Sequence, residues 1–424
     1  MNDRQLQESL PPPPVVEEVD CCVIGGSCTG VFAAVRAARR GLRVAVVEAL
    51  GAFGGTATAS LVNVWHSLYD ISGERQIIAG LTAEVLDRLA RRDAVIANEP
   101  SPSLPYRFNS QELRLELDEL VGEHDIRPFL HARFAAPVVD EAGRLIAVAI
   151  EDASGRRAVR ARWFLDASGN AELAQRAGCP CRIPTVVQPP TTCAVVAGLE
   201  AVYAADPDFN FGRAAFDPQY PEALPPGFLW TAGLPGADGL TMVAGTRVHG
   251  ANVGDADQLT RAEMSGRAQV RRLLDLLRRR IPGGEAVRLV DLADRIGCRD
   301  SRHPHCRYTI SEEEVLRGKA FDDAIGFGSY RVDLHTPDGH GITLRYLDGR
   351  EEFLAHGRKE SSRWAAPGEA TATYYQIPWR CLLPRQATNL VIAGRCIDAE
   401  PGAFGALRVM VNCNQMGEAA GEAA

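Results

Sequence analysis

The stretch that most constrains the fold is residues 19–48, in which an apolar run, a glycine turn, a helical pattern and a second apolar run follow one another. Cys21–Ile24 is short and apolar and stops abruptly at Gly25, as a buried parallel strand does. Val31–Arg40 has the apolar spacing of a helix, and Arg43–Val47 is rich in β-branched residues. This order predicts a βαβ unit, the first unit of a dinucleotide-binding fold.

The turn residues of this unit favour a bound nucleotide. Gly25 permits the tight turn, Gly30 lets the helix and strand approach closely, and the helix N-terminus would face the pyrophosphate. Ser27, directly after Gly26, replaces the middle glycine of the usual G-x-G-x-x-G pattern, and its hydroxyl can still donate to a phosphate. Glu48 ends the second strand, where a carboxylate accepts the hydroxyls of the adenosine ribose. A glycine-rich turn in some other α/β fold would leave Glu48 unexplained.

Length, charge and cysteine content exclude several classes of protein. The chain has 424 residues, enough for two domains, and its net charge of −8 argues against nucleic acid as an obligatory partner. No apolar run approaches the ~18–20 residues of a transmembrane helix, and the N-terminus lacks the apolar core of a secretory signal. Eleven cysteines, an odd number, then indicate reduced thiols, and none has zinc-finger spacing. We expect a cytoplasmic protein without metal or membrane, acting on a small molecule; a homodimer is compatible with the sequence.

Composition along the chain predicts four segments. Residues 1–18 end in a proline run and are expected to form a disordered tail. Residues 19–180 would form the first part of the nucleotide-binding domain, and residues 181–384 a mixed α+β substrate domain. Residues 385–424 return to the first domain with an apolar strand, a glycine and a helix rich in small residues.

Periodicity and capping residues predict the main elements within these segments. Helices are expected over 77–92, after Asn109, after Thr260, after Ser311 and from Gly394 to the C-terminus. Strands are expected over Arg127–Phe134, Val138–Glu151, Arg157–Leu165 and Leu390–Ala393, with the middle ones forming an antiparallel meander. Gly417 and Gly421 would let the last helix pack closely on the sheet.

Three strand-to-turn junctions are expected to meet at one edge of the sheet. They are Ile24-Gly25, Leu165-Asp166 and Ala393-Gly394. In a doubly wound sheet, ligands bind at the carboxyl ends of the strands. The sequence therefore predicts an α/β, Rossmann-like domain with its ligand at these junctions.

Five motifs in this order resemble the FAD-dependent oxidoreductases of the glutathione-reductase-like flavoprotein fold, over nearly the whole chain. The motifs are Gly54–Thr58, Arg299–Arg302, Asp333–His335, Tyr374–Pro378, and Ala393–Arg395 with Arg408–Met410. They are specific for the family but not for a substrate. Two segments depart from it, His303–Cys306 and Asp398–Pro401, which implies a substrate unlike that of most relatives. Relatives also run on by a further helix, so the resemblance implies that a closing helix is missing or that the protein is shortened.

The resemblance implies FAD as the cofactor and assigns it residues from several segments. The FAD-binding residues would be Gly25, Gly26, Ser27, Gly30, Glu48, Gly54, Gly55, Thr56, Thr58, Ala167, Gly169, Gly394, Arg395 and Gly405. The helix after Gly405 would point its positive end at the pyrimidine edge of the flavin, where negative charge grows on reduction.

A substrate would then lie over the flavin ring, between the two domains. Candidate acid–base groups are His335, His66 and Tyr375, and Arg299, Arg302 and Arg395 could hold a carboxylate or carbonyl oxygen. Asp333 would orient the imidazole of His335. Alternatively, His66 packs beside its loop or tethers the flavin covalently, and the arginines of 299–302 pair with acids and hold the domains together.

We expect an enzyme that oxidises or reduces a polar small metabolite by hydride transfer with the flavin, as a dehydrogenase or oxidase. A flavin-dependent monooxygenase is an alternative, although Gly394-Arg395-Cys396 replaces the Gly-Asp-Ala-Ala-His-like turn that it would normally show. An electron-transfer subunit of a larger complex is another, although it usually needs iron–sulfur clusters and their cysteine runs. A flavin-binding protein without catalysis is the last alternative.

Overall fold

A seven-stranded sheet forms the centre of the computed structural model, which describes residues 11–98, 106–225, 227–336, 341–355, 358–369 and 372–424. The strand order is β6-β2-β1-β9-β8-β7, with β22 also paired to β9. These strands are β1 (Val15–Ile24), β2 (Val44–Val47), β6 (Arg127–Phe129), β7 (Arg133–Val139), β8 (Leu145–Asp152), β9 (Gly155–Asp166) and β22 (Leu390–Ile392). The α/β fold class with a parallel, Rossmann-like core is confirmed.

The predicted βαβ unit is present, with parallel β1 and β2 flanking α1 (Cys28–Arg39). The prediction of a tail through residue 18 is wrong for its last residues, because β1 begins at Val15 and pairs with β9 from there. Glu18 adds an ion pair to Arg160 of β9, at 2.7 Å. Residues 1–10 lie outside the described residues.

One long strand, β9, pairs with three other strands. From Ala158 to Asp166 it pairs in parallel with β1. On its other side it pairs first with β8, from Gly155 to Arg160, and then with β22, from Phe164 to Asp166. The predicted meander and the returning C-terminal strand therefore share one edge of β9, which brings the three junctions together.

The strand expected over Arg127–Phe134 is two strands in the structure. His131, between them, has a φ of 51°, a left-handed conformation that interrupts an extended run. Its N–H donates to Leu50 O at 3.0 Å, and the next N–H, of Ala132, donates to Glu48 O. The turn thus lets β6 pair with β2 while β7 joins the meander.

A second antiparallel sheet, β12-β13-β11-β14, lies under the long helix α7 (Ala256–Arg280). Its strands are β11 (Ala194–Ala197), β12 (Trp230–Gly233), β13 (Leu240–Ala244) and β14 (Arg288–Leu292). The helix begins earlier than predicted, because Asp255 caps it by accepting from Gln258 N at 2.9 Å. Thr260 lies inside the helix, where its hydroxyl donates to Ala256 O.

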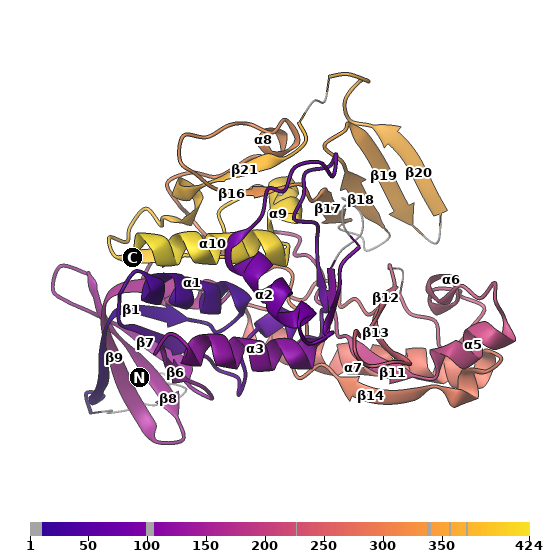
Figure 1. The fold of residues 1–424 in the computed structure, drawn as a ribbon, viewed down its shortest axis with the longest axis horizontal. Coiled ribbons are helices and arrows are strands. Elements are labelled where there is room, and N and C mark those ends of the chain that lie inside the picture. Colours follow the sequence, from indigo (N-terminus) through magenta and orange to yellow (C-terminus); the bar gives the residue numbers. More distant parts are fainter. Residues whose placement is uncertain (1–10, 99–105, 226, 337–340, 356–357, 370–371) are drawn as a thin grey trace, which may run out of the picture.

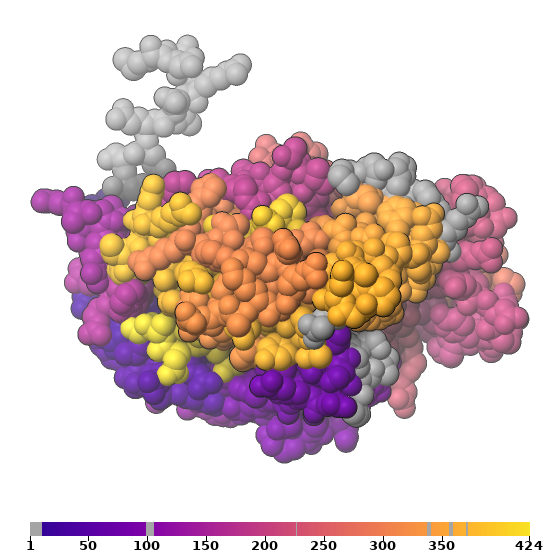
Figure 2. Space-filling view, turned by 90° about the horizontal axis from the view of Figure 1, so that it is seen from above, coloured from indigo at the N-terminus to yellow at the C-terminus, as the bar shows by residue number. Residues whose placement is uncertain are grey.

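A third group of strands covers the other side of the molecule (Figures 1 and 2). It comprises β16 (Ala324–Gly328) with β21 (Tyr375–Pro378), and the sheet of β17 (Val332–His335), β18 (Ile342–Arg345), β19 (Arg350–Ala355) and β20 (Arg358–Arg363). Seen from above, these orange segments and the yellow C-terminal segment occupy the middle of the visible face. The glycine turn expected over 337–341 lies, apart from its last residue, outside the described residues.

The remaining elements are short or peripheral. They are α2 (Gly80–Ala90), α3 (Ser110–Gly122), α4 (Glu172–Arg176), α5 (Leu199–Ala205), α6 (Phe211–Ala215), α8 (Glu312–Leu316), β3 (Val64–Trp65), β4 (Val95–Ile96), β5 (Tyr106–Phe108), β10 (Cys181–Arg182) and β15 (His303–Pro304). The predicted caps at Asn109 and Ser311 are present, the latter as a full capping box. The domain boundaries at residues 180 and 384 remain predictions.

The returning segment ends in two helices where one was predicted. After β22 the chain forms α9 (Pro401–Leu407) and then α10 (Met410–Ala423). The two glycines of α10 face α1 and not the sheet: a Cβ on Gly417 would lie 2.1 Å from Thr29 O, and one on Gly421 would lie 2.0 Å from Ala33 O. In Figure 1, α10 lies directly above α1.

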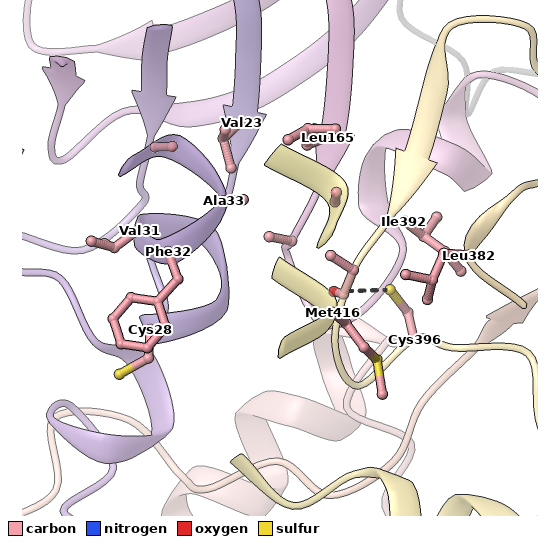
Figure 3. Packing of buried hydrophobic residues seen from close by; sticks show 14 of the residues in the cluster. Val23, Cys28, Val31, Phe32, Ala33, Leu165, Leu382, Ile392, Cys396 and Met416 are labelled. Carbon is pink, nitrogen blue, oxygen red and sulfur yellow. Dashed lines mark hydrogen bonds between the residues drawn. The ribbon is translucent and has the colours of Figure 1, made fainter. Parts of the chain in front are cut away.

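The core joins the sheet to these two helices. Val23 of β1 and Leu165 of β9 lie side by side, with Phe32 of α1 and Met416 of α10 packed beyond them (Figure 3). All four side chains are fully buried. This packing fixes the N-terminal ends of both helices relative to the carboxyl ends of the strands.

Two further findings concern the described part of the chain. It contains no helix that is both long and apolar enough to cross a membrane. It also contains no cluster of His, Cys, Asp or Glu suited to a metal ion. All eleven cysteines fall within it, and none is in a disulfide.

Candidate active site

A cavity of about 650 Å³ lies at the carboxyl ends of the central parallel strands. Gly25 after β1, Ala167 after β9 and Ala393 after β22 all line it. The structure therefore brings together the three junctions that the sequence predicted would meet.

At one end of the cavity, Glu48 is held in place by backbone N–H groups. Its Oε2 accepts from Gly26 N at 2.6 Å and its Oε1 accepts from Leu50 N at 2.8 Å, and the side chain is only 7% exposed. A carboxylate fixed in this way keeps its remaining lone pairs for the hydroxyls of a ribose. Gly26 itself does not line the cavity and acts through Glu48.

The glycines of the first turn allow a backbone approach that no other residue could make. A Cβ on Gly25 would lie 2.5 Å from Ala167 O, and one on Gly30 would lie 1.8 Å from Gly25 O. Gly30 does not line the cavity, so its role is the predicted packing of α1 on the turn. Ser27, the N-cap of α1, lines the cavity, and its side chain makes no capping hydrogen bond, which leaves the hydroxyl free for a phosphate.

The loop after Glu48 forms part of the same wall. Gly54, Gly55 and Thr56 line the cavity, and Gly54 bridges to Ser27. Thr58 does not line it: this residue is fully buried, and its hydroxyl donates to Phe53 O at 2.6 Å. Thr58 therefore holds the loop in shape and does not face a ligand.

The second and third junctions meet through Arg395. Its Nη2 donates to Asn170 Oδ1 at 2.6 Å, and it lies beside Gly169, on which a Cβ would be 3.1 Å from that nitrogen. Both Gly169 and Arg395 line the cavity. Gly394 does not, and its φ of 87° serves the turn after β22.

The N-terminus of α10 also faces the cavity. Val409, Met410, Cys413 and Asn414 line it. A helix whose positive end faces the ligand is therefore present, as expected. It was predicted to follow Gly405 directly, whereas α10 begins at Met410. Gly405 lies in α9 outside the cavity, where its small size lets α9 approach β17: a Cβ there would be 2.6 Å from Asp333 O.

Three of the four predicted catalytic residues line the same cavity, namely His66, His335 and Arg299. Tyr375 does not. It is fully buried, its hydroxyl donates to Ala406 O at 3.2 Å, and that hydroxyl accepts from Asn412 Nδ2 at 2.9 Å. Tyr375 thus joins β21 to α9 and α10, and its proposed acid–base role is wrong on this geometry.

Arg302 does not line the cavity either. It donates to the backbone oxygens of Gly254 and Asn170, the latter at 3.4 Å. Its neighbour Asp300 accepts from Gln188 N and pairs with His303 Nε2 at 3.0 Å. Arg302 therefore ties distant segments together through backbone oxygens, and not through the acid partner that the alternative role expected.

Both histidines of the cavity are neutral bases. Burial, together with the positive charge of Arg331, lowers the pKa of His66 to about 3. Burial, followed by Arg247 and Arg299, lowers the pKa of His335 well below its ordinary value. The ring of His66 stacks on Tyr330, with 4.1 Å between centroids.

Asp333 does not make the predicted hydrogen bond to His335 among the described residues. Its Oδ2 accepts from the Tyr330 hydroxyl at 3.1 Å and faces Arg408 Nη2 at 3.4 Å. Its Oδ1 is buried and has no hydrogen-bond partner among the described residues. Burial alone would raise the pKa of Asp333, but Arg408 and the neighbouring cations hold it well below its usual value, so the group is a carboxylate.

Sequence reasoning missed Arg247, Tyr330 and Arg331, which also line the cavity. Tyr330 and Arg331 lie three and two residues before Asp333, so their position could have suggested them. Arg247 follows β13 after a Gly-Thr pair, a strand-to-turn junction in the second sheet. The sequence offered no sign that this turn would reach the first domain's ligand.

The residues at the Glu48 end fit the adenosine diphosphate half of FAD. The fixed carboxylate, the free Ser27 hydroxyl, the α1 N-terminus and the glycine contacts are the groups that such a ligand needs. The Gly54–Thr56 wall and the α10 N-terminus border the remaining volume, where the flavin ring would lie.

Comparison with known proteins gives one family match over nearly the whole chain and several more distant likenesses. A ferredoxin–NADP reductase from Saccharopolyspora erythraea is 40% identical over 81 residues, which are 19% of this chain and 23% of that protein's length. The chain is similar in fold to p-nitrophenol 4-monooxygenase PnpA from Pseudomonas putida DLL-E4, with 14% identity over 69% of this chain and 71% of that chain and a TM-score of 0.44. It is also similar to the myxobacterial chondrochloren halogenase CndH, with 13% identity over 95% of this chain and 72% of that one and a TM-score of 0.44. The family model described as FAD dependent oxidoreductase matches residues 20–424, and the chain belongs to this family.

Proposed function

We propose that this FAD-dependent oxidoreductase is a dehydrogenase or oxidase that oxidises a C–H bond beside a hydroxyl or amine of a polar small metabolite. The observation that carries the proposal is the presence of the neutral base His335 in the same cavity as the FAD-binding turns. Bound FAD supplies the two-electron acceptor for the hydride from carbon. The chain's own residues must then hold the metabolite and remove the remaining proton.

His335 is the better candidate for that proton. It lies at the end of β17, and its backbone N–H donates to Gln188 Oε1 at 3.2 Å, which fixes the strand end at the cavity wall. Its lowered pKa leaves the imidazole unprotonated at pH 7, so it can accept a proton from a hydroxyl or ammonium group, and the same shift makes it a weaker base than an exposed histidine. His66 is the second candidate, and its stacking on Tyr330 holds its ring in one orientation.

The surrounding cations would help this proton transfer. Arg408 lies beside Asp333 and Arg331 lies over the ring of Tyr330, and both arginines line the cavity. As the substrate hydroxyl loses its proton, developing negative charge is stabilised by fixed positive charge in a buried site.

The test is flavin reduction under anaerobic conditions in the His335→Ala variant, with the metabolite that bleaches the wild-type flavin. A positioned base contributes roughly 10²–10⁴-fold, so the reduction rate should fall by that factor while FAD content stays unchanged. His305→Ala is the matched control, because this histidine is exposed and lies outside the cavity. An unaltered rate in His335→Ala would move the base to His66.

The same experiment separates the dehydrogenase from a hydroxylase. A dehydrogenase flavin is bleached by its own substrate without oxygen. A flavin hydroxylase is instead reduced by NADH or NADPH and then needs oxygen. The chain has one glycine fingerprint of the dinucleotide type, at Gly25–Gly30, so we expect low micromolar NADH or NADPH to leave the flavin oxidised. Rapid bleaching by either would overturn the proposal.

A further inference from the structure

A buried arginine, Arg247, and a partly buried one, Arg299, share one hydroxyl acceptor in the cavity wall. Arg247 Nη1 donates to Thr191 Oγ1 at 2.9 Å, and Arg299 Nη1 donates to the same oxygen. Their other acceptors are backbone carbonyls: Thr246 O for Arg247 and Pro189 O for Arg299, both at 2.6 Å. Both side chains line the cavity. We call them the arginine pair.

The arginine pair has no acid of its own. Among the described residues, no carboxylate lies within ion-pair distance of either guanidinium. Arg247 is only 4% exposed, and its Nε is buried without a hydrogen-bond partner. Two like charges so close together and removed from water are unfavourable unless an anion joins them. Burial lowers the pKa of Arg247 to about 10, so this guanidinium stays charged at pH 7. Burial, together with the positive charge of Arg247, also lowers the pKa of Arg299.

The nearest acid is already engaged. Asp333 Oδ2 accepts from Tyr330 and faces Arg408 Nη2, whereas Oδ1 has no hydrogen-bond partner among the described residues, so Arg408 balances the charge of this carboxylate from one side. Arg331 also lines the cavity and stacks over Tyr330, with 4.9 Å from its guanidinium carbon to the ring centroid. The substrate side of the cavity therefore carries several arginines against one aspartate.

The arginine pair does not lie at the end of the cavity where the phosphates of FAD would bind. The nucleotide end is built by other segments, the α1 N-terminus with Ser27 and the turn around Gly169 with Arg395. Arg247 follows β13 in the second sheet, and its backbone N–H donates to Gln269 Oε1 of α7 at 2.8 Å. Arg299 is coupled electrostatically to Asp333 and lies with it on the substrate side.

Resting on the proposed function, we infer that the substrate carries a carboxylate, which the arginine pair binds in the cavity that His335 also lines. The planar guanidinium forks of two arginines match the two oxygens of a carboxylate, with Thr191 as the brace that fixes their separation. The metabolite is thus a small organic acid whose oxidisable carbon lies near its carboxylate end.

The test uses the FAD-loaded full chain and follows the visible flavin spectrum during titration. The probes are acetate, malonate and benzoate, each against its uncharged amide (acetamide, malonamide and benzamide), at constant ionic strength. We expect at least one carboxylate to perturb the spectrum with saturation, and its amide to bind at least tenfold more weakly. Arg299→Met should weaken carboxylate binding by roughly 10- to 100-fold, since a charge-assisted hydrogen-bonding group is lost.

Two further variants keep the result decisive. Arg299→Lys retains the charge but not the fork, and it should recover only part of the affinity. Arg271→Gln is the control, because Arg271 is an exposed residue of α7 that does not line the cavity. This variant should bind the carboxylates as tightly as the wild type does.

Three results would overturn the inference while FAD stays bound. One is equal binding of carboxylates and amides. Another is unchanged carboxylate affinity in Arg299→Met together with a shifted flavin reduction potential, which would assign the arginine to the flavin. The third is equally tight competition by sulfate, which would show a general anion site. Failure of the proposed function looks different, because no metabolite would then reduce the flavin anaerobically even though carboxylates still bind.

Discussion

His66 lies against Tyr330 with 4.1 Å between ring centroids and 33° between the ring planes, so an aromatic ring covers part of its imidazole. Burial, with Arg331 adding to it, lowers its pKa to about 3, although Asp333 acts in the opposite direction. In the unfolded chain the same group titrates near 6.5. The two states therefore bind different numbers of protons between pH 3 and 6.5.

That difference predicts a loss of stability in acid. Between these pH values the unfolded chain binds a proton at His66 and the folded chain does not, so the free energy of unfolding falls as the pH falls below 6.5. From pH 7 to pH 5 we expect a loss of about 1–2 kcal/mol from this residue. Urea unfolding of the wild type and of His66→Phe, which keeps the ring contact but cannot titrate, measures it. Equal pH dependence in the two proteins would contradict the prediction, and His305→Gln serves as the exposed control.

Glu48 should control FAD affinity. Its two oxygens accept from Gly26 N and Leu50 N, and an amide has only one oxygen to accept with. Glu48→Gln should therefore raise the dissociation constant of FAD roughly 10- to 100-fold, the range for losing a hydrogen bond to a charged group. Equilibrium dialysis of the flavin gives the constant. Glu141→Gln, in an exposed turn, should match the wild type; if both variants match it, Glu48 does not bind the ribose.

The nucleotide end of the site could be predicted from the sequence because its determinants are local. Gly25, Gly30 and Glu48 lie within one βαβ unit, and strand period, helix spacing and turn chemistry fix their relation without any distant contact. The three junctions followed from the same rule about parallel strands. Their meeting at one cavity needed only that β9 and β22 join the same sheet.

The substrate end could not be predicted in the same way, because distant segments build it. Arg247 and Arg299 both donate to the hydroxyl of Thr191. The sequence around each of these residues does not predict that contact. Tyr375 shows the reverse error: a motif placed it near the flavin, but its side chain turns toward Ala406 between helices. Local sequence patterns determine where helices and strands form. The direction in which a side chain points between distant segments depends on how those segments pack.

The buried position of Tyr375 predicts a structural and not a catalytic effect of its removal. In Tyr375→Phe the donor to Ala406 O is lost, but Asn412 Nδ2 still donates to that oxygen at 3.1 Å. We expect a loss of about 0.5–1.5 kcal/mol in stability and an unchanged rate of anaerobic flavin reduction. Urea unfolding and stopped-flow reduction of the same preparation measure both. A rate reduced by tenfold or more at full FAD content would return Tyr375 to the mechanism.

The contact between α10 and α1 should be the most sensitive point of the helical layer. A Cβ on Gly417 would lie 2.1 Å from Thr29 O, a backbone atom that cannot rotate away, so Gly417→Ala must push the helices apart. Overpacking of this kind costs about 1–3 kcal/mol, even though alanine favours a helix over glycine. Because Thr29 lies in the first turn of α1, which faces the pyrophosphate site, FAD should also bind more weakly.

Gly122→Ala in α3 is the matched control: no atom lies within 4 Å of its added Cβ, so this variant should be as stable as the wild type or slightly more stable. Unfolding midpoints and retained flavin, compared across the three proteins, decide the matter, and equal values for Gly417→Ala and the wild type would show that the two helices can separate without cost.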